Sequence, residues 1–208
     1  MGDEKTARTR NRRGEGGRLR EEIVAAAVNL LDEAGDSGAV TLRAVARQAG
    51  IAAPSIYRHF PDQPSIMLAV VQLAFDELYE RLSSARDAAP EEPRARLFAV
   101  SEAYLDFAER HPGRYRTMFG GAWMPDLSAT VLTESDMTAL GQDSLGLLAE
   151  ALAGCVEAGL ATSDDLAADA VALWLGLHGL AHQRAVTVVF PGPDDIAERM
   201  ITALAHLR

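Results

Sequence analysis

The sequence has a single cysteine, Cys155, so the chain forms no internal disulfide bond. Its apolar stretches are interrupted by charged residues well before the roughly 20 residues that a membrane-spanning helix needs. The first residues are polar and rich in arginine, and they lack the apolar segment of a secretory signal peptide. Together these absences predict a cytoplasmic protein.

Runs of β-branched residues are also scarce, whereas alanine and leucine dominate, which favours helices over strands. The chain lacks the GxSxG and HExxH motifs, the phosphate-binding loop, the GxGxxG motif and paired cysteines. We therefore expect neither an enzyme nor a bound cofactor. His178 and His182 lie four residues apart on one predicted helix, but only Cys155 is available as a third ligand, so we expect no metal site.

The charge is distributed unevenly along the 208 residues. The net charge is −10, yet residues 1–20 contain seven basic and three acidic residues, while residues 61–208 contain ten basic and 22 acidic residues. An acidic body with a basic N-terminal end is typical of a protein that presents one local surface to an anion. Residues 1–17 are predicted to be a disordered basic leader, whose arginines either enter a DNA minor groove or are simply solvated.

Apolar residues make up 48% of the chain, enough for a packed core, and they recur at helical spacing. The sequence predicts an all-α protein of about nine helices. Their approximate bounds are 18–34, 42–49, 54–59, 62–85, 93–110, 114–123, 128–161, 163–189 and 193–207.

Residues 42–59 have the spacing of a helix-turn-helix. Small Ala46 lies where two short helices would cross, Gly50 turns the chain between them, and Ile56 is positioned for burial. The second short helix would then project its polar face outward, as a helix that enters a DNA major groove does. This explains why hydrogen-bonding side chains gather on the short segment 54–59, namely those of Ser55, Tyr57, Arg58 and His59.

Residues 18–66 resemble the DNA-binding domain of TetR-family transcriptional repressors. The resemblance is carried by "REEIVAAAVNLLDEAG", by "VTLRAVARQAGIAAPSIYRHFPDQPSI" and by the aliphatic helix that follows. The stretch "LWLGLHGLAHQR" resembles a Trp-His-Gly motif of one subgroup of TetR-like ligand domains. Such families often have Ser-Lys or Ser-Arg where this chain has Ala52-Ala53, and a lysine where it has Gln63. These departures shift the expected DNA contacts toward Arg43, Arg58 and the arginines of residues 1–17.

The resemblance implies a helix-turn-helix domain over residues 18–64 and a larger helical ligand-binding and dimerisation domain over residues 65–208. The DNA-binding residues that it implies are Thr41, Arg43, Ala53, Pro54, Ser55, Tyr57, Arg58 and His59. Tyr57 and His59 match phosphate-contacting positions, although packing on the next helix and capping of the short helix are the alternatives. Arg43 either reads a guanine or holds a phosphate.

The resemblance also implies a homodimer through the last two helices. The apolar residues expected at this interface are Leu173, Leu177, Leu180, Ala181, Ala185, Val188, Ile196, Met200, Ile201 and Leu204, with small Gly176 and Gly179 allowing close approach. The alternative is that these residues complete the core of a monomer.

The resemblance, more than the residue types themselves, implies a pocket for a small-molecule effector among large apolar and aromatic residues on several helices, although core packing explains any one of them. The residues are Tyr104, Phe107, Tyr115, Met118, Phe119, Trp123, Met137, Trp174 and His178. The function expected is therefore a homodimeric repressor that a small, largely apolar ligand releases from a palindromic DNA operator. The alternative is a helical DNA-binding protein or activator without a small-molecule inducer.

Overall fold

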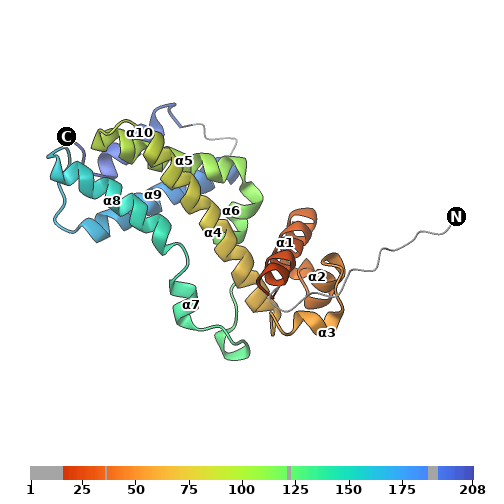
Figure 1. Ribbon diagram of the computed structural model, residues 1–208. Helices are drawn as coiled ribbons and strands as arrows, with labels where there is room; N and C mark the ends of the chain where they lie inside the picture. Colours follow the sequence, from red (N-terminus) through yellow and green to blue (C-terminus); the bar gives the residue numbers. More distant parts are fainter. Residues whose placement is uncertain (1–15, 36, 121–122, 187–191) are drawn as a thin grey trace. The chain divides into compact units, whose positions relative to one another are not determined.

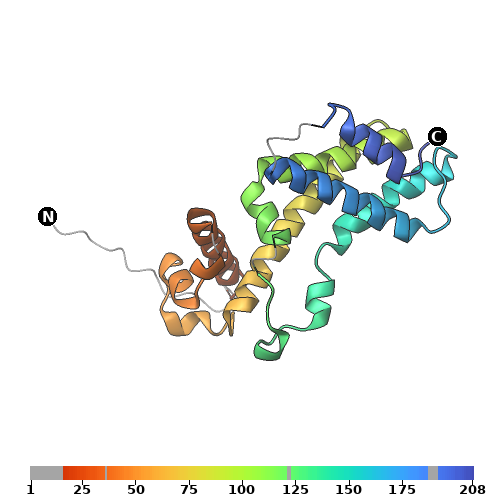
Figure 2. The same ribbon diagram turned by 180° about the vertical axis from the view of Figure 1, so that it is seen from behind.

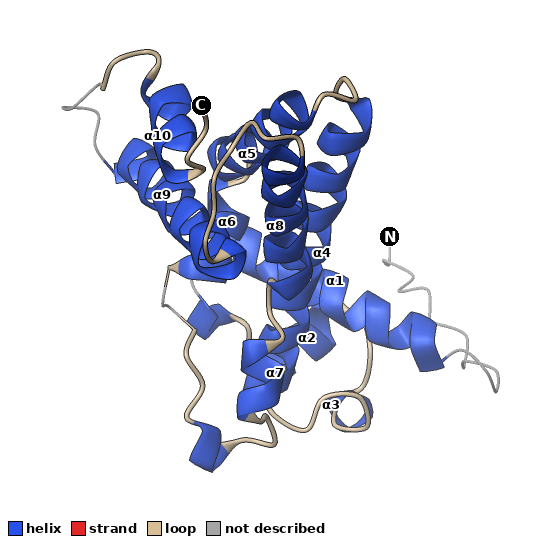
Figure 3. Cartoon of the chain, turned by 90° about the vertical axis from the view of Figure 1, so that its left-hand side faces the viewer, coloured by secondary structure: helices blue, strands red, loops and turns tan. Residues whose placement is uncertain are grey.

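The computed structural model describes residues 16–35, 37–120, 123–186 and 192–208. In these ranges the chain forms helices and no strand, which confirms the all-α prediction (Figure 3). Apart from residues 16 and 17, the predicted basic leader lies outside the described residues, as does Val188 of the predicted interface. None of the helices within these ranges is both long and apolar enough to cross a bilayer.

The chain divides into two compact units, and the first comprises the residues up to Val71 together with residues 121–134. Its elements are α1 (Gly16–Ala34), η1 (Ser37–Ala39), α2 (Leu42–Gln48), α3 (Ala53–Ile56), the start of α4 (Gln63–Ala88) and η2 (Leu127–Ala129) (Figure 1). Their apolar faces form one core, which includes Ile23, Ala27, Val40, Val45, Ala46, Ile56, Phe60, Ile66, Met67 and Val70.

The chain direction between α2 and α3 is set by two local features. The Thr41 hydroxyl accepts a hydrogen bond from the Ala44 amide at 3.2 Å and so caps the start of α2. After α2, Gly50 adopts φ +65°, a conformation that favours glycine, and the next amide, of Ile51, donates to the Ala46 carbonyl at 3.0 Å. The sharp turn that the sequence predicted at Gly50 is therefore present.

Asp62 fixes the start of α4 within the first unit. Its carboxylate accepts from the Ser65 amide at 2.9 Å and from the Ser65 hydroxyl. The other carboxylate oxygen accepts from the Thr130 hydroxyl at 2.6 Å and from the Val131 amide at 3.3 Å. Burial raises the pKa of Asp62, but these hydrogen bonds outweigh burial and lower it below its usual value.

The second unit comprises residues 72–120 and 135–208. Its elements are the remainder of α4, α5 (Pro93–Arg110), α6 (Pro112–Phe119), most of α7 (Glu134–Thr138), α8 (Gln142–Glu157), α9 (Leu166–Val186) and α10 (Ile196–Leu204). Helix α5 packs against α8 and α9, and α9 also packs against α8 and α10 (Figures 1 and 2). The core between them includes Leu97, Val100, Phe107, Leu152, Leu173 and Leu177.

The long helix predicted over residues 128–161 is wrong. That stretch contains η2, α7 and α8, and α8 begins only after Gly141, which has φ +75°. A left-handed residue ends the regular helical path, so this stretch is divided, and the described residues contain ten α-helices where about nine helices were predicted. Helices α9 and α10 also begin three residues later than predicted, at Leu166 and Ile196.

Candidate functional sites: a nucleic-acid interface and an apolar cavity

The helix-turn-helix of the first unit presents its polar residues to solvent. Six of the eight predicted DNA-binding residues are exposed, namely Thr41, Arg43, Ala53, Pro54, Tyr57 and Arg58. Ser55 and His59 are half-buried. Tyr57 is 52% exposed, so about half of its surface is accessible to a partner. The structure thus leaves the whole predicted set available, and contact with DNA remains a prediction.

Packing of one short helix orients this surface. Helix α3 has only four residues, and Ile56 at its end is fully buried against the core that contains Val45 and Ala46. The amides of His59 and Phe60 both donate to the Ile56 carbonyl at 2.9 Å, which closes the turn after the helix. Tertiary contacts therefore hold a segment that is too short to be a stable helix alone.

Residues 41–61 contain three arginines and no acidic residue, although the whole chain carries a net charge of −10. The exposed arginines of this segment are Arg43, Arg47 and Arg58. Arg47 was not among the predicted residues, yet its spacing of four from Arg43 on α2 indicates the same helical face. The local excess of positive charge is of the kind that binds phosphates.

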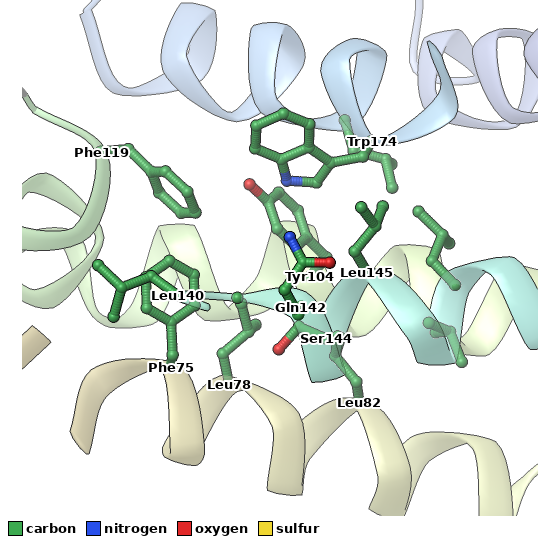
Figure 4. Close-up of a pocket in the computed structure, with 14 residues that line it drawn as sticks. Phe75, Leu78, Leu82, Tyr104, Phe119, Leu140, Gln142, Ser144, Leu145 and Trp174 are labelled. Carbon is green, nitrogen blue, oxygen red and sulfur yellow. The ribbon is translucent and has the colours of Figure 1, made fainter. Parts of the chain in front are cut away.

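A cavity of about 210 Å³ lies inside the second unit (Figure 4). It is lined from α4, α5, α6, α8, α9 and the turn before α8. The lining residues are mostly aliphatic and aromatic and none is charged; they are Phe75, Leu78, Leu82, Val100, Tyr104, Phe119, Leu140, Gly141, Gln142, Ser144, Leu145, Leu148, Trp174 and Leu177. An apolar cavity with a few polar groups is typical of a small-molecule site.

Three of the predicted pocket residues line this cavity: Tyr104, Phe119 and Trp174. Six do not: Phe107, Tyr115, Met118, Trp123, Met137 and His178. Trp123 belongs to the first unit, where it packs on that unit's core, and Phe107 and Met118 pack in the core of the second unit. The prediction missed the wall that α4 contributes, although the apolar spacing of Leu78 and Leu82 indicated an inward face.

A hydrogen-bonded cluster supports one end of the cavity. The Tyr115 hydroxyl lies 2.6 Å from Nδ1 of His178, and the Tyr104 hydroxyl lies 3.4 Å from both the Tyr115 hydroxyl and the same Nδ1. The Trp174 ring stacks on the His178 ring with 5.6 Å between centroids. His178 is therefore a supporting partner of the cavity residue Tyr104 and is not itself part of the lining.

Burial determines the protonation of this cluster. Desolvation raises the pKa values of both tyrosines, Tyr104 and Tyr115, above the ordinary tyrosine value, which already lies well above neutral pH. Desolvation, together with the nearby His182, lowers the pKa of His178, so its neutral form is favoured. The cluster is thus a set of neutral hydrogen-bonding groups, and the described residues contain no group of three potential metal ligands.

The predicted interface residues of the last two helices are only partly accessible. Leu173, Leu177, Ala181 and Ile201 are buried in the second unit's own core, so this part of the prediction was wrong and its monomer-core alternative holds for them. Gly176 likewise lets α10 approach α9 within one chain, since an added Cβ would lie 2.3 Å from Leu204.

The outer face of α9 carries the apolar residues that remain uncovered. Val171 is 39% exposed and Leu175 is 54% exposed. They are four residues apart, and Ala168, Gly179 and His182 continue the same helical face with exposed side chains or backbone. This stripe, which we call the α9 face, is a candidate surface for a second copy of the chain.

Comparison with known families identifies matches over two stretches of the chain. Residues 23–70 match the family of bacterial regulatory proteins called the tetR family, and residues 97–204 match the tetracyclin repressor-like C-terminal domain. Nucleoid occlusion factors SlmA are similar: that of Vibrio vulnificus is 31% identical over 105 residues, and that of Marinobacter nauticus is 34% identical over 106. These matches cover 50% of this chain, and the chain spans 53%, about half, of the length of these relatives.

Solved structures resemble the chain over nearly its full length. A protein of unknown function from Rhodococcus sp. RHA1 has a TM-score of 0.72 and 25% identity, with 94% of this chain and 95% of that protein covered. A putative transcriptional regulator from Pseudomonas aeruginosa PAO1 has a TM-score of 0.71 and 18% identity, with 93% of each chain covered. At the latter identity the likeness shows a common fold only.

Proposed function

Because this chain belongs to the TetR family of bacterial regulatory proteins, we propose that it is a homodimeric transcriptional repressor that binds a palindromic DNA operator. In this proposal residues 18–64 bind DNA, residues 65–208 bind a small, largely apolar ligand and dimerise, and residues 1–17 supply extra positive charge. The observation that carries the proposal is the exposed, cationic helix-turn-helix: Arg43 and Arg47 on α2 and Tyr57 and Arg58 just after α3 are all exposed, and the buried Ile56 holds α3 in place.

The exposed groups divide by the kind of DNA contact that their chemistry allows. Tyr57, Arg58 and His59 follow or end the short helix α3 and are suited to phosphate oxygens, which fix the position of a protein on the duplex. Arg43 lies in the first turn of α2 and reads a guanine edge or holds a phosphate. Ala53 and Pro54 expose small apolar surfaces that can pack on a thymine methyl group.

Dimerisation supplies the surface that one short helix lacks. Specific DNA complexes bury about 1,000–2,500 Å² of protein surface, and a single α3 cannot provide it. Two copies related by a two-fold axis double the contact and require a palindromic site. We place the contact on the α9 face around Val171 and Leu175, because these apolar side chains are exposed in the single chain.

Ligand release would act through α4. This helix supplies Phe75, Leu78 and Leu82 to the cavity wall, and its first residues, 63–71, belong to the unit that contains the helix-turn-helix. A ligand that binds the DNA-free position of α4 more tightly than the DNA-bound position lowers DNA affinity. The factor equals the ratio of the two ligand affinities. A ligand with equal affinity for both positions would leave DNA binding unchanged.

Selection of bound duplexes from a random library tests the DNA-binding proposal. The enriched sequence should be a palindrome. Tyr57→Ala should weaken binding to all sequences. A separate variant, Arg58→Ala, should also weaken binding to all sequences, and it should reduce the slope of log affinity against log salt concentration by about one unit. Tyr79→Ala is the matched control, since Tyr79 is 39% exposed but lies in the second unit. Wild-type affinity in the Tyr57 variant would refute the assignment.

Arg43→Ala separates the two roles of that residue. If Arg43 reads a base, the variant should lose about 1–3 kcal/mol and accept other bases at one position of the operator. If Arg43 holds a phosphate, the loss should be uniform across sequences. Unchanged affinity and unchanged preference would remove Arg43 from the interface.

A second candidate is a DNA-binding protein or activator that needs no small molecule. The similarity to proteins named nucleoid occlusion factors favours it, whereas the apolar cavity favours the ligand-released repressor. The two are separated by measuring DNA affinity with and without compounds that bind the cavity.

A further inference from the structure

The wall of the cavity carries no charged side chain. Its polar side chains are those of Tyr104, Gln142, Ser144 and Trp174, and all other lining side chains are hydrocarbon. Transfer of an ionised group into such surroundings is strongly unfavourable unless a partner of opposite charge is present. The wall therefore selects against carboxylates, phosphates and ammonium groups at any buried position.

A second, outer hollow of about 390 Å³ adjoins the cavity. Four residues line both spaces, namely Phe75, Leu140, Gly141 and Ser144. The outer hollow also has three acidic residues, Asp76, Glu80 and Asp143, and no lysine or arginine among its lining residues. Since negative charges repel anions along this approach, the hollow adds to the selection against acids.

Aromatic rings from four helices surround the space (Figure 4). Phe75 meets Phe119 edge-on with 5.5 Å between centroids, and Phe119 lies 6.2 Å from Trp174. Rings at such separations favour edge and offset contacts with a further flat ring. A volume of about 210 Å³ is somewhat larger than the ~150 Å³ in which benzene binds, so it suits one or two fused rings.

One polar group of the wall has no partner in the structure. The Ser144 hydroxyl is buried without a hydrogen bond, and the residue is only 8% exposed. By contrast, the Tyr104 hydroxyl already has Tyr115 and His178 as hydrogen-bond partners. Because a buried hydroxyl without a partner is unfavourable, a ligand that supplies a donor or acceptor at Ser144 gains affinity there.

We propose that the cavity binds an uncharged, planar molecule of one or two fused aromatic rings with one hydroxyl group, and that this group hydrogen-bonds to Ser144. The proposal rests on the proposed function in one respect, namely that this cavity is the effector site. It deepens that function, because it replaces "largely apolar ligand" with a chemical class and names the residue that selects it.

The test measures the affinities of four probes for the full chain by isothermal titration calorimetry. The reference probe is 2-naphthol. Naphthalene lacks its hydroxyl group, 2-naphthoate carries a negative charge, and 1-decanol keeps a hydroxyl group but has no ring. Ser144→Ala is compared with Ser101→Ala, since the Ser101 hydroxyl is also buried without a partner but does not line the cavity.

We expect the wild type to bind 2-naphthol about five- to ten-fold more tightly than naphthalene, the factor of one net hydrogen bond. It should bind 2-naphthoate and 1-decanol more weakly than 2-naphthol. The preference for 2-naphthol over naphthalene should disappear in the Ser144 variant and persist in the Ser101 variant.

Each other result overturns a stated part of the proposal. Equal binding of 2-naphthol and naphthalene, or equal losses in both serine variants, overturns the role of Ser144. Tighter binding of 1-decanol or 2-naphthoate overturns the ligand class, and absence of binding by all four probes overturns the whole proposal. DNA release is measured separately on the selected duplex: binding of 2-naphthol without release refutes the ligand-released repressor while leaving the selectivity of the cavity intact.

Discussion

Replacement of Gly141 by alanine tests whether a close approach of backbone to a ring shapes the cavity. An added Cβ at Gly141 would lie 2.6 Å from Cε1 of Phe75 and 3.2 Å from two further ring atoms. The ring must therefore move. Gly141 also has φ +75°, which is unfavourable for alanine whatever the space around it. The expected loss of stability has these two contributions.

Gly159→Ala measures the backbone contribution by itself. Gly159 follows the other end of α8, has φ +71°, and would place its Cβ more than 4 Å from other atoms. Its variant should lose about 1–2 kcal/mol, the cost of a left-handed alanine. Gly141→Ala should lose that amount plus about 1–3 kcal/mol for displacement of a packed ring, so about 2–5 kcal/mol in total.

The assay is urea denaturation of both variants and the wild type at one protein concentration, with circular dichroism used to monitor unfolding. Titration with 2-naphthol provides a second measurement, because a displaced Phe75 ring changes the wall shared by the cavity and the outer hollow. Equal losses of unfolding free energy in the two variants would show that the Phe75 contact is relieved without cost, and our account of this wall would then be refuted.

Three further predictions concern the α4 cap, the buried histidine and the α9 face. Asp62→Ala should cost about 1 kcal/mol at pH 7 through loss of a helix cap. Hydrogen bonds lower the pKa of Asp62 in the folded chain, so the unfolded chain binds the proton at a higher pH than the folded chain. The difference in unfolding free energy between wild type and variant should therefore shrink as the pH falls below about 4. A constant difference in urea titrations down to pH 3 would contradict this. Burial lowers the pKa of His178, so the stability that its neutral form contributes is full above about pH 6.5 and is lost as the pH falls below that value. The melting temperature of the wild type should therefore fall more steeply from pH 7 to 5 than that of His178→Gln. Parallel curves would disprove this. Leu175→Asp should give monomers in sedimentation equilibrium at micromolar concentration, whereas Met124→Asp, at a more exposed apolar residue of the first unit, should remain dimeric; a dimeric Leu175 variant would move the interface elsewhere.

Local signals in the sequence were sufficient for the helix-turn-helix. The Thr41 cap, the turn at Gly50 and the burial of Ile56 each follow from residues within a short distance along the chain, and all three are present in the structure. The helix predicted over residues 128–161 was wrong because the prediction followed the helical spacing of apolar residues across Gly141, where the structure begins a new helix. The glycine, with polar Gln142 and Asp143 after it, was the available signal for a new helix start.

The orientation of α9 was harder to predict, because this helix is apolar on two faces. Leu173 and Leu177 lie on one side and Val171 and Leu175 on the other, and periodicity alone does not say which pair faces the chain's own core. The structure buries the first pair completely and exposes the second. Membership of the cavity wall has the same difficulty, since it depends on contacts between helices distant in sequence.

The position of Phe75 gives the ligand-released mechanism its shortest physical connection. Val71 is the last α4 residue of the first unit, and Phe75 follows it by four residues, which is about one helical turn. Upstream, Ile66, Met67 and Val70 pack in the core that supports the helix-turn-helix, while Phe75 forms the wall beside Gly141. In the proposed mechanism, a ligand that moves the Phe75 ring would act on an α4 residue that lies about one helical turn along the chain from Val71. This proximity carries regulation only if the ligand affinity differs between the DNA-bound and DNA-free positions of α4, so the decisive quantity is the ratio of ligand affinities measured with and without operator DNA.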